Sequence, residues 1–128
     1  MLAQRLPLLD AEHTAFIAGP VSINVAACGA DGFPALARAV GCMVSEDACS
    51  VTIMLSAKAG ADAVAGIRKS GLVAVVFSEP PTHRTVQLKG RNAQVFPPEP
   101  GDAALAARYR EGFTAVLASL GYAEGLVR

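Results

Sequence analysis

Hydrophobic and polar residues alternate with a period of two along several short stretches of the chain. The stretch "VSINVAACG" (residues 21–29) alternates in this way, and "PALARAVGCMVSE" (residues 34–46) does so again after a short break. Such alternation is typical of half-buried β-strands, because successive side chains of a strand point to opposite faces. Asp31 and Gly32 lie between the two stretches and favour a tight turn. The pattern therefore predicts a β-hairpin.

The second strand of this hairpin has two very different faces. One face carries larger side chains, and the other consists almost only of small residues, namely Ala35, Ala37, Ala39 and Gly41. The larger face is formed by Leu36, Arg38, Val40, Cys42 and Val44. A surface of alanine and glycine lets a flat molecule or another backbone approach closely. We expect the small face to meet such a partner.

Four further stretches are predicted as strands. "SVTIMLS" (50–56) follows a polar turn, and "LVAVVFS" (72–78) is an unbroken apolar run typical of a central strand. "THRTVQLK" (82–89) alternates again, with Thr85 and Gln87 on one face and Arg84 on the other. "RNAQVFP" (91–97) completes the set. The chain therefore has about six predicted strands, connected mostly by hairpins.

Three helices accompany these strands. Asp10 caps a short helix through about Ala18. A loop and helix fill residues 57–71, with Gly71 as the stop and Ala61, Val64 and Ile67 on the inner face. A C-terminal amphipathic helix spans about residues 102–120, with Asp102 as its cap, apolar residues at helical spacing that include Tyr109 and Phe113, and Gly121 as its stop.

The order of these elements predicts an α+β fold. Short consecutive strands with tight turns favour a small, closed or partly closed antiparallel barrel. One helix is inserted after the third strand, and one lies at each end. At 128 residues the chain is expected to form a single domain over 1–128.

The composition of the chain favours one kind of partner and argues against several others. The chain is 52% hydrophobic, yet it lacks the roughly 18 uninterrupted apolar residues that a membrane span requires. The excess apolar surface is expected to meet a second copy of the chain. Eleven basic and eleven acidic side chains cancel, so no overall field attracts nucleic acid or an anionic membrane. An anion site must therefore be local.

Cysteine and histidine are too sparse for a metal site. The three cysteines form no C-x-x-C pair, and only two histidines are present. The N-terminal stretch "MLAQRLPLLDAEH" reaches a proline and an aspartate before any long apolar region develops. That pattern differs from a signal peptide. We therefore expect a cytoplasmic protein with free thiols.

The order of parts resembles the FMN-binding split-barrel family, which includes pyridoxamine 5'-phosphate oxidase and its short relatives. The resemblance covers roughly residues 8–120 and rests on the hairpin "INVAACGADGFPALARAVGCMV", on "SVTIMLS" with the helix ending in "GIRKSG", on "LVAVVF" and on "HRTVQLKGRNAQV". It implies a split barrel and a homodimer that binds FMN at the interface between its two subunits.

The resemblance also implies which residues hold the cofactor. Arg38 matches the basic residue of the second strand, while Ser56 and Lys58 match the hydroxyl and basic groups that follow the third strand. Together these three would bind the phosphate. Arg84 and Thr85 match the start of the Arg-Gln-Val stretch that reaches the flavin ring across the interface, and Gln87 lies two residues further on the same strand face.

Two functions remain open at this point. The chain has Ala61-Asp62-Ala63 where the family often has Ser-Arg-Lys at the start of the helix. The first function is FMN binding, with or without flavin-dependent oxidoreductase activity. In such sites the flavin performs the redox step, so no catalytic side chain is expected. The second is a non-catalytic binding protein that has lost the phosphate site and holds another ligand, such as haem, or none.

Overall fold

The computed structural model describes residues 9–29 and 32–120, which form an α+β fold with an antiparallel sheet. The elements in chain order are α1 (Ala11–Ile17), β1 (Ser22–Cys28), β2 (Pro34–Val44), β3 (Val51–Leu55), α2 (Ala61–Ser70), β4 (Val73–Ser78), β5 (Thr85–Gly90) and α3 (Asp102–Ser119). The predicted α+β class, the helix inserted after the third strand and the two terminal helices are confirmed.

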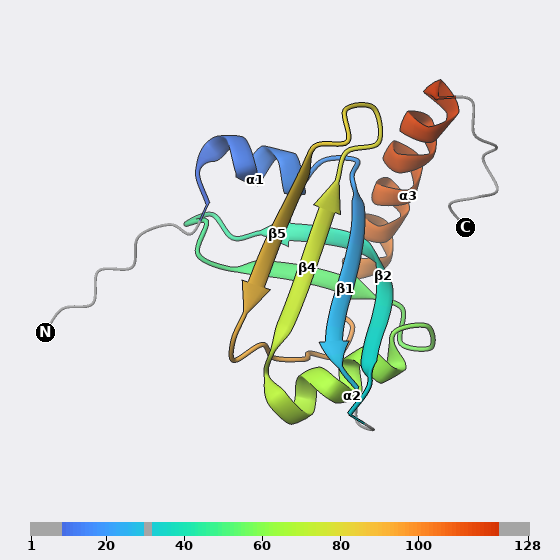
Figure 1. Cartoon of the computed structure of the whole chain (residues 1–128). Coiled ribbons are helices and arrows are strands. Elements are labelled where there is room, and N and C mark those ends of the chain that lie inside the picture. The colour runs from blue at the N-terminus through green and yellow to red at the C-terminus, as the bar shows by residue number, and fades with distance from the viewer. Residues whose placement is uncertain (1–8, 30–31, 121–128) are drawn as a thin grey trace, which may run out of the picture.

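The sheet has five strands in the order β3-β2-β1-β4-β5, and all neighbours are antiparallel. The first part of β2 pairs with β1 and its second part pairs with β3, with a register shift between Ala39 and Gly41. At this bulge the sheet folds over, since bulges bend a strand and increase its twist. Figure 1 shows β3 and the second part of β2 crossing behind β1, β4 and β5. Among the described residues the edge strands β3 and β5 do not pair, so the sheet is not closed.

The prediction of a sixth strand at residues 91–97 is wrong. This segment has no regular secondary structure, so β5 is an edge strand paired only with β4. Asn92 has a positive φ of 55°, which is incompatible with an extended strand at that residue. Ala93 and Val95 still pack against the core. The alternation therefore arises because every second side chain of this segment contacts the core, although its backbone is not part of a hydrogen-bonded ladder.

The small face of β2 lies inside the fold rather than against a partner. Ala35, Ala37, Ala39 and Gly41 are all buried, and the three alanines belong to the main hydrophobic core. The opposite face contains Leu36, which is 75% exposed. The expectation that the small face meets another molecule is therefore wrong, because the chain's own core fills that space.

The helix boundaries agree with the predictions better than their caps do. Asp10 caps α1, and its carboxylate accepts a hydrogen bond from the backbone N–H of His13 at 2.8 Å. Gly71 ends α2 in the left-handed conformation, as predicted. Asp102, in contrast, is the first residue of α3, and its carboxylate accepts from the Glu99 N–H at 2.8 Å. The predicted turn residue Asp31 and the stop at Gly121 lie outside the described residues.

The buried face of α2 differs from the prediction. Ala63, Gly66 and Ile67 are buried, whereas Ala61 is exposed. The helix thus approaches β1 and β2 through small residues, and Gly66 lies directly against the backbone of Cys28.

Two features of residues 9–29 and 32–120 bear on the expected partners. No helix in these ranges has the length and apolar character needed to cross a bilayer. Within the same residues no group of three or more His, Cys, Asp or Glu side chains is arranged to hold a metal ion.

Candidate functional site

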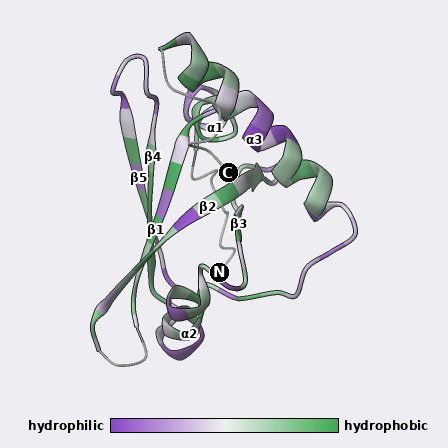
Figure 2. Ribbon diagram, turned by 90° about the vertical axis from the view of Figure 1, so that its right-hand side faces the viewer, coloured by the Kyte–Doolittle hydropathy of each residue, from purple (hydrophilic) through white to green (hydrophobic). Residues whose placement is uncertain are grey.

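The helices leave one broad face of the sheet uncovered across β1, β4 and β5, and this face meets α3 only at its β2 edge. Figure 1 views this face directly, and Figure 2 shows it edge-on, with α1, α2 and α3 away from the exposed side of β4 and β5. We call it the outer face. Its residues, placed by strand register and burial, are Ser22, Asn24, Ala26 and Cys28 of β1, Pro34, Leu36 and Arg38 of β2, Ala74, Val76 and Ser78 of β4, and Thr85, Gln87 and Lys89 of β5.

Cross-strand pairing arranges the outer face in rows, because residues opposite one another in a sheet share a face. One row is apolar at its centre and runs Leu36, Ala26, Ala74, Lys89. The next row runs Arg38, Asn24, Val76, Gln87. The outer face contains two basic side chains and no acidic one. An anionic or neutral molecule with a flat apolar part would match it.

Arg38 and Gln87, both predicted as ligand contacts, lie in the same row. Two strands separate them, so their backbones are roughly 14 Å apart at about 4.8 Å per strand. Gln87 is exposed on the edge strand. The structure therefore brings these two residues to one surface, at opposite ends of a row.

Arg38 contacts the C-terminal helix. Its guanidinium carbon lies 4.9 Å from the centre of the Phe113 ring. The Phe113 ring in turn stacks on Tyr109, with 5.7 Å between centroids and 9° between planes. Arg38 remains exposed despite these contacts.

Ser56 and Lys58 lie in the exposed loop between β3 and α2. Leu55 pairs with Ala39, the residue after Arg38, at the end of the β2–β3 ladder, and Ser56 follows Leu55 directly. The Ser56 hydroxyl accepts a hydrogen bond from the Ala59 N–H at 3.4 Å. Arg38 and this loop therefore lie at the same end of the β2–β3 ladder.

Thr85 lies at the start of β5 on the outer face. Its hydroxyl donates to the His83 carbonyl at 3.2 Å and lies 3.2 Å from the Ser78 hydroxyl on the paired strand. The predicted strand started at residue 82, but His83 has a positive φ of 60° and belongs to the preceding turn. Thr85 is thus hydrogen-bonded locally, while the next outer-face residue, Gln87, is the more available of the two.

Arg84 is directed away from the outer face. Its guanidinium donates to the Glu12 carboxylate at 2.7 Å and lies 4.9 Å from the centre of the Phe16 ring. Both partners belong to α1, so Arg84 joins the β4–β5 turn to the first helix. The structure therefore separates Arg84 from the other five predicted site residues.

Burial shifts the pKa values of two groups in this region, Tyr109 and Cys42. Burial raises the pKa of the Tyr109 hydroxyl, and the nearby Arg38 guanidinium partly opposes that shift. The hydroxyl therefore stays protonated and donates to the Val21 carbonyl at 2.5 Å. Burial also raises the pKa of the Cys42 thiol to about 12. A thiol with this pKa is not a nucleophile near neutral pH, because the thiolate is the reactive form.

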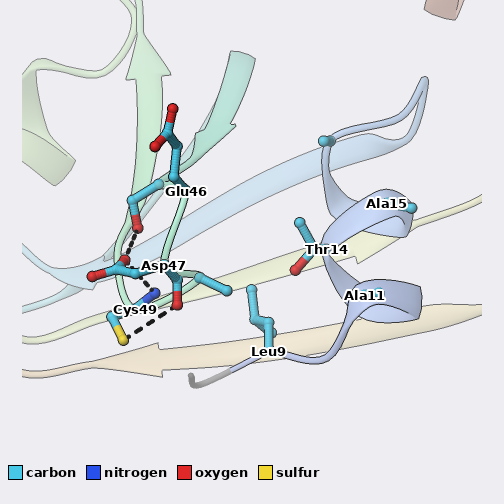
Figure 3. Close-up of a pocket in the computed structure, with 10 residues that line it drawn as sticks. Leu9, Ala11, Thr14, Ala15, Glu46, Asp47 and Cys49 are labelled. Atoms are coloured by element: carbon cyan, nitrogen blue, oxygen red, sulfur yellow. Dashed lines mark hydrogen bonds between the residues drawn. The ribbon is translucent and has the colours of Figure 1, made fainter. Parts of the chain in front are cut away.

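Two cavities lie away from the outer face. One, of about 730 Å³, lies between α1 and the turn at residues 45–49 (Figure 3). There Asp47 accepts hydrogen bonds from the Ser45 hydroxyl and the Cys49 N–H, and the buried Thr14 hydroxyl has no hydrogen-bond partner among the described residues. The other cavity, of about 280 Å³, lies between α3 and the end of α1. Neither contains any of the six predicted ligand residues.

The sequence reasoning missed the aromatic side of the site. Tyr109 and Phe113 are four residues apart, and this spacing predicted an apolar helix face. It carried no signal that the face would meet Arg38, 71 positions before Tyr109 in the chain. Asn24 was likewise missed, since its place beside Arg38 follows from strand register.

Comparisons of this chain with protein-family models, with curated proteins and with solved structures found no match.

Proposed function

We propose that the protein is a cytoplasmic, homodimeric FMN-binding protein with a split-barrel fold related to that of pyridoxamine 5'-phosphate oxidase. The outer face is the observation that carries this proposal. Across β1, β4 and β5 it is not covered by a helix, it contains no acidic side chain, and it includes three of the predicted ligand residues, Arg38, Thr85 and Gln87.

The bent sheet supports the split-barrel assignment. The bulge in β2 divides the sheet into two parts that cross one another, and α2 is inserted between β3 and β4. In Figure 1 the two parts lie one behind the other, as expected when a strongly bent sheet packs onto itself. A pair of such chains joined through their outer faces would enclose a flat ligand.

The side chains around the bend of β2 fit the phosphate of FMN. Arg38 has a planar set of donors, Ser56 adds a hydroxyl and Lys58 adds a second cation. Hydrogen bonds between charged groups are about twice as strong as neutral ones. Gln87, with both amide donors and an acceptor, would contact the polar edge of the ring bound mainly by the other subunit.

When bound, the flavin supplies the electron-transfer chemistry, and the protein orients it and excludes water. The outer face suits the second task, because its central residues Ala26, Ala74 and Val76 are apolar and would become buried in a dimer. We propose a small flavin-dependent oxidoreductase as the activity of this site.

A non-catalytic function is favoured by one observation. Asp62 lies exposed in the first turn of α2, next to the proposed phosphate loop, and it replaces a cation of the family. A carboxylate occupies the favourable end of the helix dipole and repels a phosphate. The alternative is therefore a split barrel that binds haem, or no chromophore.

The absorbance spectrum of the freshly purified protein tests the proposal. We expect flavin bands, and release of FMN rather than riboflavin or FAD on denaturation. If the protein is colourless, it should acquire a flavin spectrum when FMN is added. A Soret band would select the haem alternative. Failure to bind either chromophore would contradict the proposed function.

Dimerisation through the outer face gives a separate prediction. Leu36 is 75% exposed in the single chain, so Leu36→Asp should leave the fold intact while placing a charge in the interface. We expect the wild-type protein to sediment as a dimer. The dissociation constant of the variant dimer should be at least about tenfold higher, which corresponds to a loss of about 1.4 kcal/mol of association free energy.

Phe96→Asp is the matched control, because Phe96 is 70% exposed but lies in the irregular segment after β5. This variant should remain dimeric. A monomeric wild-type protein at micromolar concentration, or equal effects of the two variants, would show that the outer face is not the interface.

A further inference from the structure

The two stacked rings of α3 both contact the guanidinium of Arg38. Arg38 lies over Phe113 at 4.9 Å, and Phe113 stacks on Tyr109. Phe113 is only 2% exposed, and the Tyr109 hydroxyl is anchored to the Val21 carbonyl at the start of β1. The surface that Arg38 contacts is therefore rigid, because packing holds one ring and a hydrogen bond holds the other.

The ring contact occupies one face of the Arg38 guanidinium, and a hydrogen bond to the Tyr109 hydroxyl uses part of its donor set. A guanidinium that stacks on a ring uses its flat face, whereas its N–H groups point outward in the plane. Arg38 forms no salt bridge with another described residue, and it is exposed. The arginine is thus held by the Phe113 ring and by the Tyr109 hydroxyl, and the remaining N–H donors of its guanidinium stay available to a ligand.

We propose that Phe113, supported by Tyr109, is a positioning residue that orients Arg38 for the phosphate group of the ligand. Helix α3 then belongs to the ligand site, although none of its residues touches the ligand. This inference rests on the proposed function. The physical gain is preorganisation, since a free arginine side chain would lose rotamer freedom on binding an anion. The aromatic contact removes that loss in advance, and it favours ligands with a phosphate over neutral ones.

Binding of FMN and riboflavin to Phe113→Leu and Phe113→Tyr tests the inference. The leucine variant keeps an apolar side chain but removes the ring, so FMN should bind roughly tenfold more weakly while riboflavin affinity is unchanged. The tyrosine variant retains the ring and should restore FMN affinity. Equal weakening of both flavins by Phe113→Leu, or no weakening of either, would overturn the inference.

Arg38→Lys is a second variant at an exposed position, in case Phe113→Leu fails to fold. Lysine keeps the charge but cannot stack a planar group on the ring, so FMN should again weaken roughly tenfold. Arg108→Lys, on the exposed surface of α3, is the matched control and should bind FMN as the wild type does. Wild-type affinity in Arg38→Lys would overturn the inference.

The NMR signal of the Arg38 side-chain N–H separates this inference from the proposed function. In the protein without ligand, the ring current of Phe113 should shift this signal in the wild type but not in Phe113→Leu. Inorganic phosphate should then perturb it at lower concentration in the wild type than in the variant. This result would support positioning even if FMN does not bind, whereas an Arg38 signal identical in both proteins would overturn it.

Discussion

The Gly66→Ala variant is expected to lose about 3 kcal/mol or more of its free energy of unfolding. A Cβ atom at this position would lie 1.9 Å from the Cys28 carbonyl oxygen and 2.7 Å from the carbonyl carbon. Both atoms belong to the backbone of β1, so no side chain can rotate away. Helix α2 would have to move off the sheet, which also displaces the neighbouring buried residues Ala63 and Ile67.

Gly112→Ala is the matched control, because Gly112 also lies in the middle of a helix. Its added Cβ would meet the nearest atom, Cβ of Pro20, at an ordinary contact distance of 3.5 Å. Alanine is favoured over glycine inside a helix by up to about 1 kcal/mol, so this variant should be slightly more stable than the wild type. Urea unfolding at one fixed protein concentration measures both. Equal stability of Gly66→Ala and the wild type would contradict the close packing of α2 on β1.

The Phe77→Ala variant is expected to lose about 3–5 kcal/mol of its free energy of unfolding. Phe77 is fully buried on β4, between the paired residues Ile23 of β1 and Val86 of β5. Truncation removes the transfer energy of the ring and leaves a cavity that the rigid sheet cannot close. Native domains are stable by only about 5–15 kcal/mol, so this loss is a large part of the total.

Phe96→Ala provides the comparison for Phe77→Ala. Phe96 is 70% exposed, and its truncation should change stability by less than about 0.5 kcal/mol. Thermal unfolding followed by circular dichroism compares the two variants directly. If Phe96→Ala were as destabilising as Phe77→Ala, the exposed segment after β5 would have a structural role that its burial does not indicate.

The local pattern of the chain was sufficient to predict eight elements. Five strands and three helices lie within a few residues of their predicted positions, because period-two alternation and helical spacing record directly which side chains face the core. The prediction of a sixth strand was wrong for the same reason. Ala93 and Val95 face the core as strand residues would, but periodicity reports burial and not hydrogen bonding.

The candidate site was predictable in its residue types but not in its assembly. Arg38 and Gln87 were both selected through the family resemblance, and strand register placed them in one row. Arg84 was selected with them, yet its ion pair with Glu12 directs it to α1. Period-two alternation placed Arg84 on the opposite face from Gln87, but it could not identify the partner Glu12, which lies 72 residues away in the chain.

The sequence by itself determined the elements, the mixed α+β class and a core made from alternating apolar positions. Each follows from interactions between neighbours in the chain. Only the tertiary structure decided which face of β2 is buried, how closely α2 approaches β1 at Gly66, and that Arg38 rests on Phe113. The Arg38 contact lies next to the bend in β2, whereas Gly66 meets β1 at Cys28, at the other end of the β1–β2 hairpin. Their positions therefore depend on the packing of the whole chain, which a local pattern does not contain.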